Sequence, residues 1–118
     1  MQLSREQILA STDLRKELVD IPEWGGSVYV RVMTAAERDK LDARYIQRKG
    51  QNGQRSFENF RAEMVVTTVV DDAGQRLFTD ADVPQISLKS AAAVERIFNV
   101  ASRLNGLSAK DQEELAKN

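Results

Sequence analysis

The chain has 118 residues, of which 42% are apolar and 30% charged, and its formal net charge is −1. This length holds one hydrophobic core, and the near-neutral charge argues against a dedicated nucleic-acid binder. The sequence contains no cysteine and no histidine, which excludes disulfides, zinc sites built from Cys and His, and Ser-His-Asp or Cys-His catalysis.

The sequence also indicates neither a membrane-spanning segment nor a secretory signal. No apolar run approaches the roughly 20 residues that span a membrane, and the first residues do not form the apolar core of a secretory signal. We therefore expect one domain over residues 1–118 that works inside a cell. We expect it not to be an enzyme, to hold no cofactor or metal, and to have no membrane or nucleic-acid partner.

The chain opens with a short predicted helix. Ser4 and Gln7 have the spacing of a capping box, in which each side chain hydrogen-bonds the backbone N–H of the other residue. Leu3, Ile8 and Leu9 supply its apolar side chains. A helix this short is not stable alone, so we expect it to dock on another surface.

Residues 16–33 predict a β-hairpin. Apolar and polar residues alternate on both sides of the pair Gly25-Gly26, and β-branched residues recur on one face from Val28 to Val32. Two adjacent glycines permit the positive φ that a tight reversal needs. The pattern therefore predicts two antiparallel strands joined at the glycine pair.

A second capping box begins the next predicted element. Thr34 and Glu37 have the required spacing, and a helix over about 35–48 follows with a thin apolar stripe. Residues 49–55 contain two glycines and no apolar side chain. We expect this segment to be a mobile loop.

Another helix is predicted after Ser56, which has the chemistry of a cap. Phe60 and Met64 lie at helical spacing, and the apolar face continues through the run from Val65 to Val70. This β-branched run also fits a strand. We favour the helix because the residues before the run lead into it without a break.

An acidic turn at residues 71–74 precedes a short extended piece and a brief helix over 80–86, in which Pro84 is a difficulty. The turn carboxylates and those of Asp80 and Asp82 are oxygen ligands that suit a hard cation. They lack the ligand number and central glycine of a calcium loop. We interpret them as turn and cap residues.

The strongest helical pattern begins after residues 87–90. It carries a broad apolar stripe from Ala93 to Leu104 and ends at Gly106. A last short helix follows, with Leu115 as its single strong apolar anchor. The fold class is therefore α+β and mostly α-helical, with an N-terminal β-hairpin (about 16–33) packed on four to five helices.

Four residues are candidates for protein interaction. Trp24 adjoins the glycine pair, where its ring either covers the hairpin or anchors a partner, and Tyr29 follows on the second strand. Leu107 and Leu115 are the apolar anchors of a helix that gains little from its own fold. That helix suits the groove of a neighbouring molecule.

Several short segments, in their order along the chain, resemble those of a known family. The segments are IPEWGG (21–26), VYVR (28–31), TAAER (34–38), DAGQRLF (72–78), SAAAV (90–94), LNGLS (104–108) and EELAKN (113–118). Together they resemble the tail assembly chaperones of long-tailed (siphovirus-type) bacteriophages. The resemblance covers nearly the whole chain except the loop at 49–55.

The resemblance implies a non-enzymatic role. Proteins of this family act in the cytoplasm of the bacterial host and are absent from the mature virion. They bind the long, largely helical tape measure protein and keep it soluble while tail tube protein assembles around it. A longer form, made by ribosomal frameshifting, recruits the tail tube protein, and many copies act together, which implies a weak homo-oligomer.

Codons for Ala116-Lys117-Asn118 permit a slippery heptamer, so the frameshift is expected at or near these residues. The alternative functions are a structural head–tail connector that remains in the phage particle and a small adaptor or regulatory protein.

Overall fold

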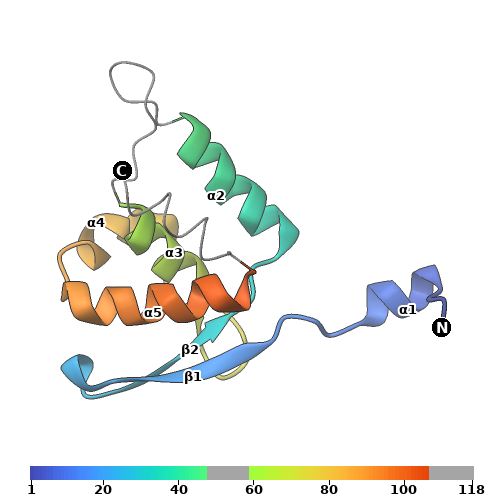
Figure 1. Cartoon of the computed structure of the whole chain (residues 1–118), viewed down its shortest axis with the longest axis horizontal. Helices are drawn as coiled ribbons and strands as arrows, with labels where there is room; N and C mark the ends of the chain where they lie inside the picture. The colour runs from blue at the N-terminus through green and yellow to red at the C-terminus, as the bar shows by residue number, and fades with distance from the viewer. Residues whose placement is uncertain (48–58, 107–118) are drawn as a thin grey trace.

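A three-stranded antiparallel sheet packs against helices in the computed structural model, which describes residues 1–47 and 59–106 (Figure 1). The expected loop at 49–55, the Ser56 cap and the last helix lie outside the described residues. The elements are α1 (Arg5–Ala10), β1 (Lys16–Ile21), the 3-10 turn η1 (Pro22–Trp24), β2 (Gly26–Arg31), α2 (Ala35–Gln47), α3 (Phe60–Thr68), β3 (Val69–Val70), η3 (Asp80–Asp82), α4 (Val83–Ile86) and α5 (Ala91–Leu104).

The predicted hairpin is confirmed. β1 and β2 pair antiparallel with Leu18 opposite Tyr29 and Val19 opposite Val28. The turn between them is η1, and Gly25 leaves it in the left-handed region at φ 74°. Alternation gives the sheet two faces, because Val19 is buried while its neighbour Leu18 is exposed.

The predicted helix through Val70 is wrong at its C-terminal end. α3 ends at Thr68, and Val69–Val70 form β3, which pairs with Tyr29 and Val30 of β2. Two causes act together. The hydroxyl of Thr68 donates back to the carbonyl of Met64 at 2.7 Å, which weakens the helix, and the β-branched valines gain a ladder with β2.

The residue that begins α3 has an unusual backbone conformation. Asn59 is the N-cap residue and adopts the left-handed conformation at φ 66° without a side-chain capping bond. From Phe60 onward the helix is largely buried, in keeping with the apolar pattern that predicted it.

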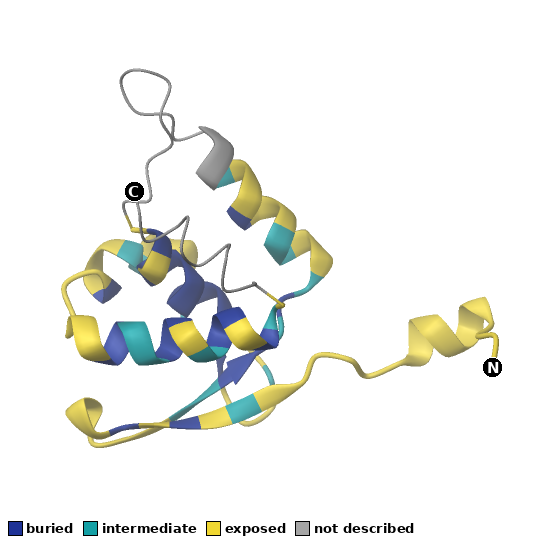
Figure 2. Cartoon of the chain, viewed as in Figure 1, coloured by how far each residue is buried: buried dark blue, intermediate teal, exposed yellow. Residues whose placement is uncertain are grey.

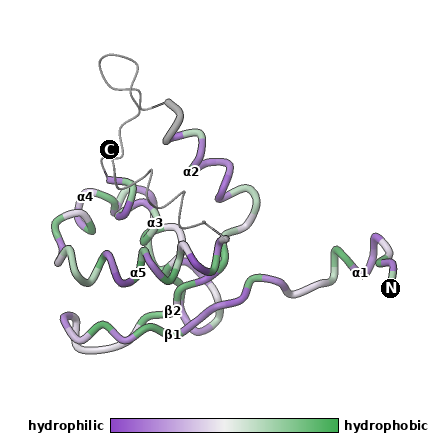
Figure 3. Tube along the Cα trace, in the orientation of Figure 1, coloured by the Kyte–Doolittle hydropathy of each residue, from purple (hydrophilic) through white to green (hydrophobic). Residues whose placement is uncertain are grey.

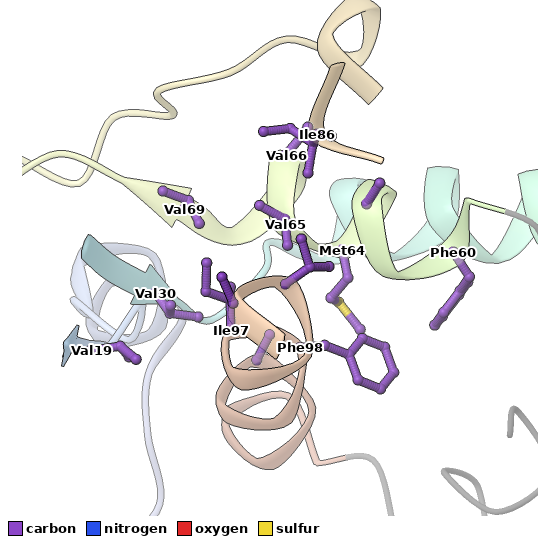
Figure 4. Packing of buried hydrophobic residues seen from close by; sticks show 14 of the residues in the cluster. Val19, Val30, Phe60, Met64, Val65, Val66, Val69, Ile86, Ile97 and Phe98 are labelled. Atoms are coloured by element: carbon purple, nitrogen blue, oxygen red, sulfur yellow. The ribbon is translucent and has the colours of Figure 1, made fainter. Parts of the chain in front are cut away.

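The core lies between the sheet, α3 and α5 (Figures 2 and 4). The apolar stripe predicted for α5 is confirmed, since Ala93, Ile97 and Ala101 are fully buried. Phe60 and Phe98 meet edge to face with ring centroids 5.9 Å apart. Ser90 accepts a hydrogen bond from the N–H of Ala93, and Gly106 follows the helix at φ 73°, so both predicted ends of this helix hold.

Residues 35–44 of α2 make several polar contacts with the rest of the domain. Figure 3 shows it mostly in hydrophilic colours, and Leu41 is its buried side chain among residues 35–44. The predicted capping box is present, with Thr34 N donating to Glu37 Oε1 at 2.9 Å and Glu37 N to Thr34 Oγ1 at 3.1 Å. Asn105 Oδ1 accepts from Met33 N at 2.8 Å, which ties the end of α5 to the start of α2.

The difficulty at Pro84 disappears because the brief helix divides into two pieces. η3 ends at Asp82 and α4 begins at Val83, so Pro84 lies in the first turn of α4, where its missing N–H has no helical partner to lose. Thr79 and Asp82 form a capping box at the start of η3.

A candidate protein-interaction surface

Exposed apolar side chains gather near the N-terminus. Among the described residues, the exposed large hydrophobic side chains are Met1, Leu3, Ile8, Leu9, Leu14, Leu18, Trp24, Leu77 and Leu88. Six of these nine lie within the first 18 residues. Contiguous apolar surface left in water is a candidate site for the binding of another molecule.

The first part of this surface is an N-terminal arm, residues 1–14. Every residue of the arm is exposed, and the arm leads away from the body of the molecule (Figures 1 and 2). α1 has the predicted capping box, with Ser4 N donating to Gln7 Oε1 at 2.8 Å and Gln7 N to Ser4 Oγ at 3.2 Å. The expected helix therefore forms, but it does not pack on its own domain.

The second part is the outer sheet face, defined by Lys16, Leu18, Asp20, Ser27 and Tyr29. These residues share one side of β1 and β2, opposite the core. Leu18 is 57% exposed and lies across from Tyr29, which is partly buried. The ammonium of Lys16 lies 5.1 Å from the centre of the Tyr29 ring, and Asp20 accepts a hydrogen bond from Ser27.

Trp24 lies in the turn at the tip of the hairpin and is 37% exposed. The tip is held by a two-point ion pair, because Arg96 of α5 donates to both carboxylate oxygens of Glu23 at 2.6 and 3.0 Å. This hydrogen bonding from Arg96, with a backbone hydrogen bond, lowers the pKa of Glu23 from 4.5 to about 2. Trp24 is thus presented on an anchored turn.

A third feature is a pocket of mixed polar and apolar lining between α3, α4 and the first half of α5, which we name the α3–α4–α5 pocket. Its volume is about 440 Å³, and its apolar walls include Phe60, Ile86 and Val94. Charged side chains line it as well. Arg61 forms an ion pair with Glu95 and lies over the ring of Phe98, and Lys89 lies in the turn before α5.

The acidic residues considered for a cation are engaged in local structure. Asp71 Oδ1 accepts from Ala73 N at 2.9 Å and from Gln75 N at 3.0 Å, as a turn residue does. Asp82, rather than Asp80, closes the capping box with Thr79. Over residues 1–47 and 59–106, no group of three or more Asp or Glu side chains is placed to hold a metal ion.

Asp80 instead belongs to an ion-pair cluster with Arg44 and Arg76. Burial raises the pKa of Asp80, but the hydrogen bond from Arg76 and the nearby positive charges outweigh it, so the net shift is downward. Arg76 also donates to the carbonyl of Val66 at 2.7 and 3.0 Å. The cluster fastens the segment after β3 to α3.

The structure describes two of the four residues that the sequence suggested for protein interaction. Trp24 and Tyr29 both lie on the hairpin, at its tip and on its outer face, whereas Leu107 and Leu115 lie outside the described residues. Sequence reasoning missed Leu18 and Leu88, although strand alternation signals Leu18, which shares a face with polar Lys16 and Asp20. No local pattern signals Leu88, which is 86% exposed in the turn beside the pocket. No helix among the described residues is both long enough and apolar enough to cross a membrane.

Two of three comparisons with known proteins found a match. The sequence model of the phage tail assembly chaperone family matches residues 4–118. The solved structure of the bacteriophage HK97 tail assembly chaperone is similar, with 16% sequence identity and a TM-score of 0.61 over 87% of this chain and 94% of that one. No curated protein matches. Because the family model covers nearly all of its length, the chain belongs to the phage tail assembly chaperone family.

Proposed function

We propose that this tail assembly chaperone binds the tape measure protein, keeps it soluble in the cytoplasm of the bacterial host, and is absent from the mature virion. In this role several copies associate weakly, and a longer frameshifted form recruits tail tube protein. The family match supports the general role. The observation that carries the tape measure contact is the exposed apolar side chain of Leu18 beside Tyr29 on the outer sheet face.

This face has the chemistry that an apolar helical partner needs. Leu18 and the Tyr29 ring provide apolar area, while Lys16 and Asp20 provide a charged rim. Trp24 at the tip of the same hairpin adds an aromatic side chain of the kind that concentrates binding energy. A long partner then gains its affinity from many such contacts along its length.

A pull-down of tape measure protein tests this contact with two matched variants. Leu18→Ser removes the central apolar side chain and is expected to weaken retention by about tenfold or more, because burial of a leucine contributes about 1.5–3 kcal/mol. Leu77→Ser is the control. Leu77 is 53% exposed and lies in the segment after β3, outside the strands β1 and β2 that define the outer sheet face.

Equal retention of the wild-type and Leu18→Ser proteins would remove the outer sheet face from the proposal.

The frameshift is tested separately by reading the codons for Ala116-Lys117-Asn118. A slippery run with an overlapping downstream frame is expected there. Mass spectrometry of purified virions tests the absence of the chain from the particle, and its presence would favour the structural connector.

A further inference from the structure

One side of the β1 backbone has no neighbouring strand. The sheet order is β1-β2-β3, so β1 is an edge strand, and no strand among the described residues pairs with its outer side (Figure 1). The opposite edge of the sheet differs, because Val70 of β3 forms a bridge with Arg76. An open edge strand is a template on which another strand pairs.

The backbone groups on this open edge belong to Lys16, Leu18 and Asp20. Val32 N donates to the carbonyl of Arg15 at 2.9 Å, so Arg15 directs its backbone groups toward β2. Along an antiparallel strand this direction alternates from one residue to the next. Lys16, Leu18 and Asp20 therefore direct their N–H and C=O groups away from β2, and all three residues are exposed.

The contacts of β1 with the helices come from the core side of the sheet. Arg103 of α5 donates to Glu17 at 2.5 Å, and Glu17 shares the core side with buried Val19. The N-terminal arm leads away from the body of the molecule beyond the start of β1 (Figure 1). The edge between Lys16 and Asp20 is thus left accessible to a second strand.

This edge is complementary to itself. When two copies of β1 lie antiparallel with Leu18 opposite Leu18, Lys16 of each copy lies opposite Asp20 of the other. Every opposed pair then has outward-directed backbone groups and exchanges two hydrogen bonds, and the facing opposite charges stabilise the pairing. A shift of two residues in either direction places Leu18 opposite a charged residue and leaves the charges unmatched, so charge selects one register.

We propose that two copies of the chain pair through their β1 edges in this register, so that the three strands of each copy join in one sheet. This inference rests on the self-association in the proposed function and assigns a surface to it. The contact is isologous, with residues 16–20 of each copy facing the same residues of the other. It is much smaller than a standard protein interface, so the pair is weak and depends on concentration.

Pairing also completes the outer sheet face. Leu18 lies across from Tyr29 within each copy. In the joined sheet, Tyr29 and Leu18 of one copy and Leu18 and Tyr29 of the second form a single row across four strands, about 14 Å long. The row places the exposed leucines of the two copies side by side, which gives a partner a continuous apolar site that one copy lacks.

Sedimentation equilibrium of the full chain tests the register by charge reversal. Lys16→Glu and Asp20→Lys each place like charges opposite one another, and each variant alone is expected to associate about tenfold or more weakly than the wild type. An equimolar mixture of the two variants restores both opposed pairs and is expected to associate like the wild type, with one copy of each in the pair.

Two variants control for the change in net charge. Lys89→Glu and Asp72→Lys make the same charge changes at exposed positions outside β1. Each is expected to associate like the wild type, both alone and in an equimolar mixture. A gain on mixing that is confined to the Lys16→Glu and Asp20→Lys pair therefore reports the contact between strands and not a general attraction between oppositely charged proteins.

Hydrogen exchange followed by NMR locates the contact on the backbone. The Leu18 amide points away from β2, so its exchange in the wild-type protein is expected to slow as the concentration rises. The Val19 amide points toward β2 and is expected to exchange slowly at every concentration. This alternation between neighbouring amides is specific to pairing through the β1 edge.

Three results would overturn the proposal. Wild-type chain that stays monomeric at millimolar concentration removes the pair. A mixture of Lys16→Glu and Asp20→Lys that associates no better than either variant alone removes the register. A Leu18 amide whose exchange is independent of concentration while the mass rises places the contact elsewhere. The solubility of tape measure protein is measured in a separate co-expression assay, so the proposed chaperone function fails or holds independently of this pairing.

Discussion

Ile97 lies at the centre of the core, fully buried on α5 where the helix faces α3 and the sheet. Ile97→Ala leaves a cavity in close-packed surroundings and is expected to lower the free energy of unfolding by about 2–5 kcal/mol. Urea unfolding followed by circular dichroism measures it. Leu9→Ala on the exposed arm is the comparison and is expected to change stability by less than about 0.5 kcal/mol. Equal effects would mean that the core is misplaced.

The Glu23–Arg96 pair gives the hairpin tip a pH dependence. The pKa of Glu23 is lowered from 4.5 to about 2 in the folded state, chiefly by the hydrogen bonds from Arg96. Its contribution to stability is therefore complete above about pH 4.5 and is lost as the pH falls toward 2. An NMR titration of the Glu23 carboxyl measures this directly.

Arg96→Met is the variant that isolates the cause. It keeps the aliphatic length of the side chain and removes the donors, so the pKa of Glu23 should return toward 4.5. A Glu23 carboxyl that titrates near 4.5 in the wild-type protein would contradict the two-point ion pair.

Part of the candidate surface could be predicted from residue type alone. Trp24 and Tyr29 stand out by residue type, and both lie on the hairpin that was predicted around them. Leu18 was predictable from alternation alone. The α3–α4–α5 pocket was not, because Phe60, Ile86 and Val94 come from three segments that only the tertiary fold brings together.

At the scale of the element, Gly25 determines the hairpin turn. Its φ of 74° suits glycine, and a methyl group added there meets no atom within 4 Å, so the cost of substitution is conformational. Gly25→Ala is expected to destabilise the protein by about 1–2 kcal/mol. Gly26→Ala, at a position without positive φ and with equal space, is expected to be nearly neutral. Thermal unfolding compares them, and matching losses would contradict the turn geometry.

Elements with strong local signals were predicted from the sequence, and those that depend on distant partners were not. The Gly25-Gly26 pair with flanking alternation specifies the hairpin locally, and the stripe through Ala93 and Ile97 specifies α5 in the same way. The sequence did not predict β3, because Val69 and Val70 follow a helix without a break. Only pairing with β2 makes them a strand. α1 was predicted as a helix, but its separation from the domain has no local signal.

Across the molecule, the buried core and the exposed apolar side chains lie in different places. α3, α5 and the sheet form the core, while the arm, the outer sheet face and the hairpin tip present apolar side chains outward (Figure 2). This division separates stability from binding. Leu18→Ser on the outer sheet face therefore should change partner binding while leaving the free energy of unfolding within about 0.5 kcal/mol.

We propose that this chain keeps tape measure protein soluble, a claim that its membership of the tail assembly chaperone family and its exposed apolar side chains support. Co-expression of the two proteins tests it most directly, with the soluble fraction of tape measure protein measured after centrifugation. We expect that fraction to rise severalfold with the wild-type chain and to rise less with Leu18→Ser. A tape measure protein that is equally insoluble with and without the wild-type chain would contradict the claim.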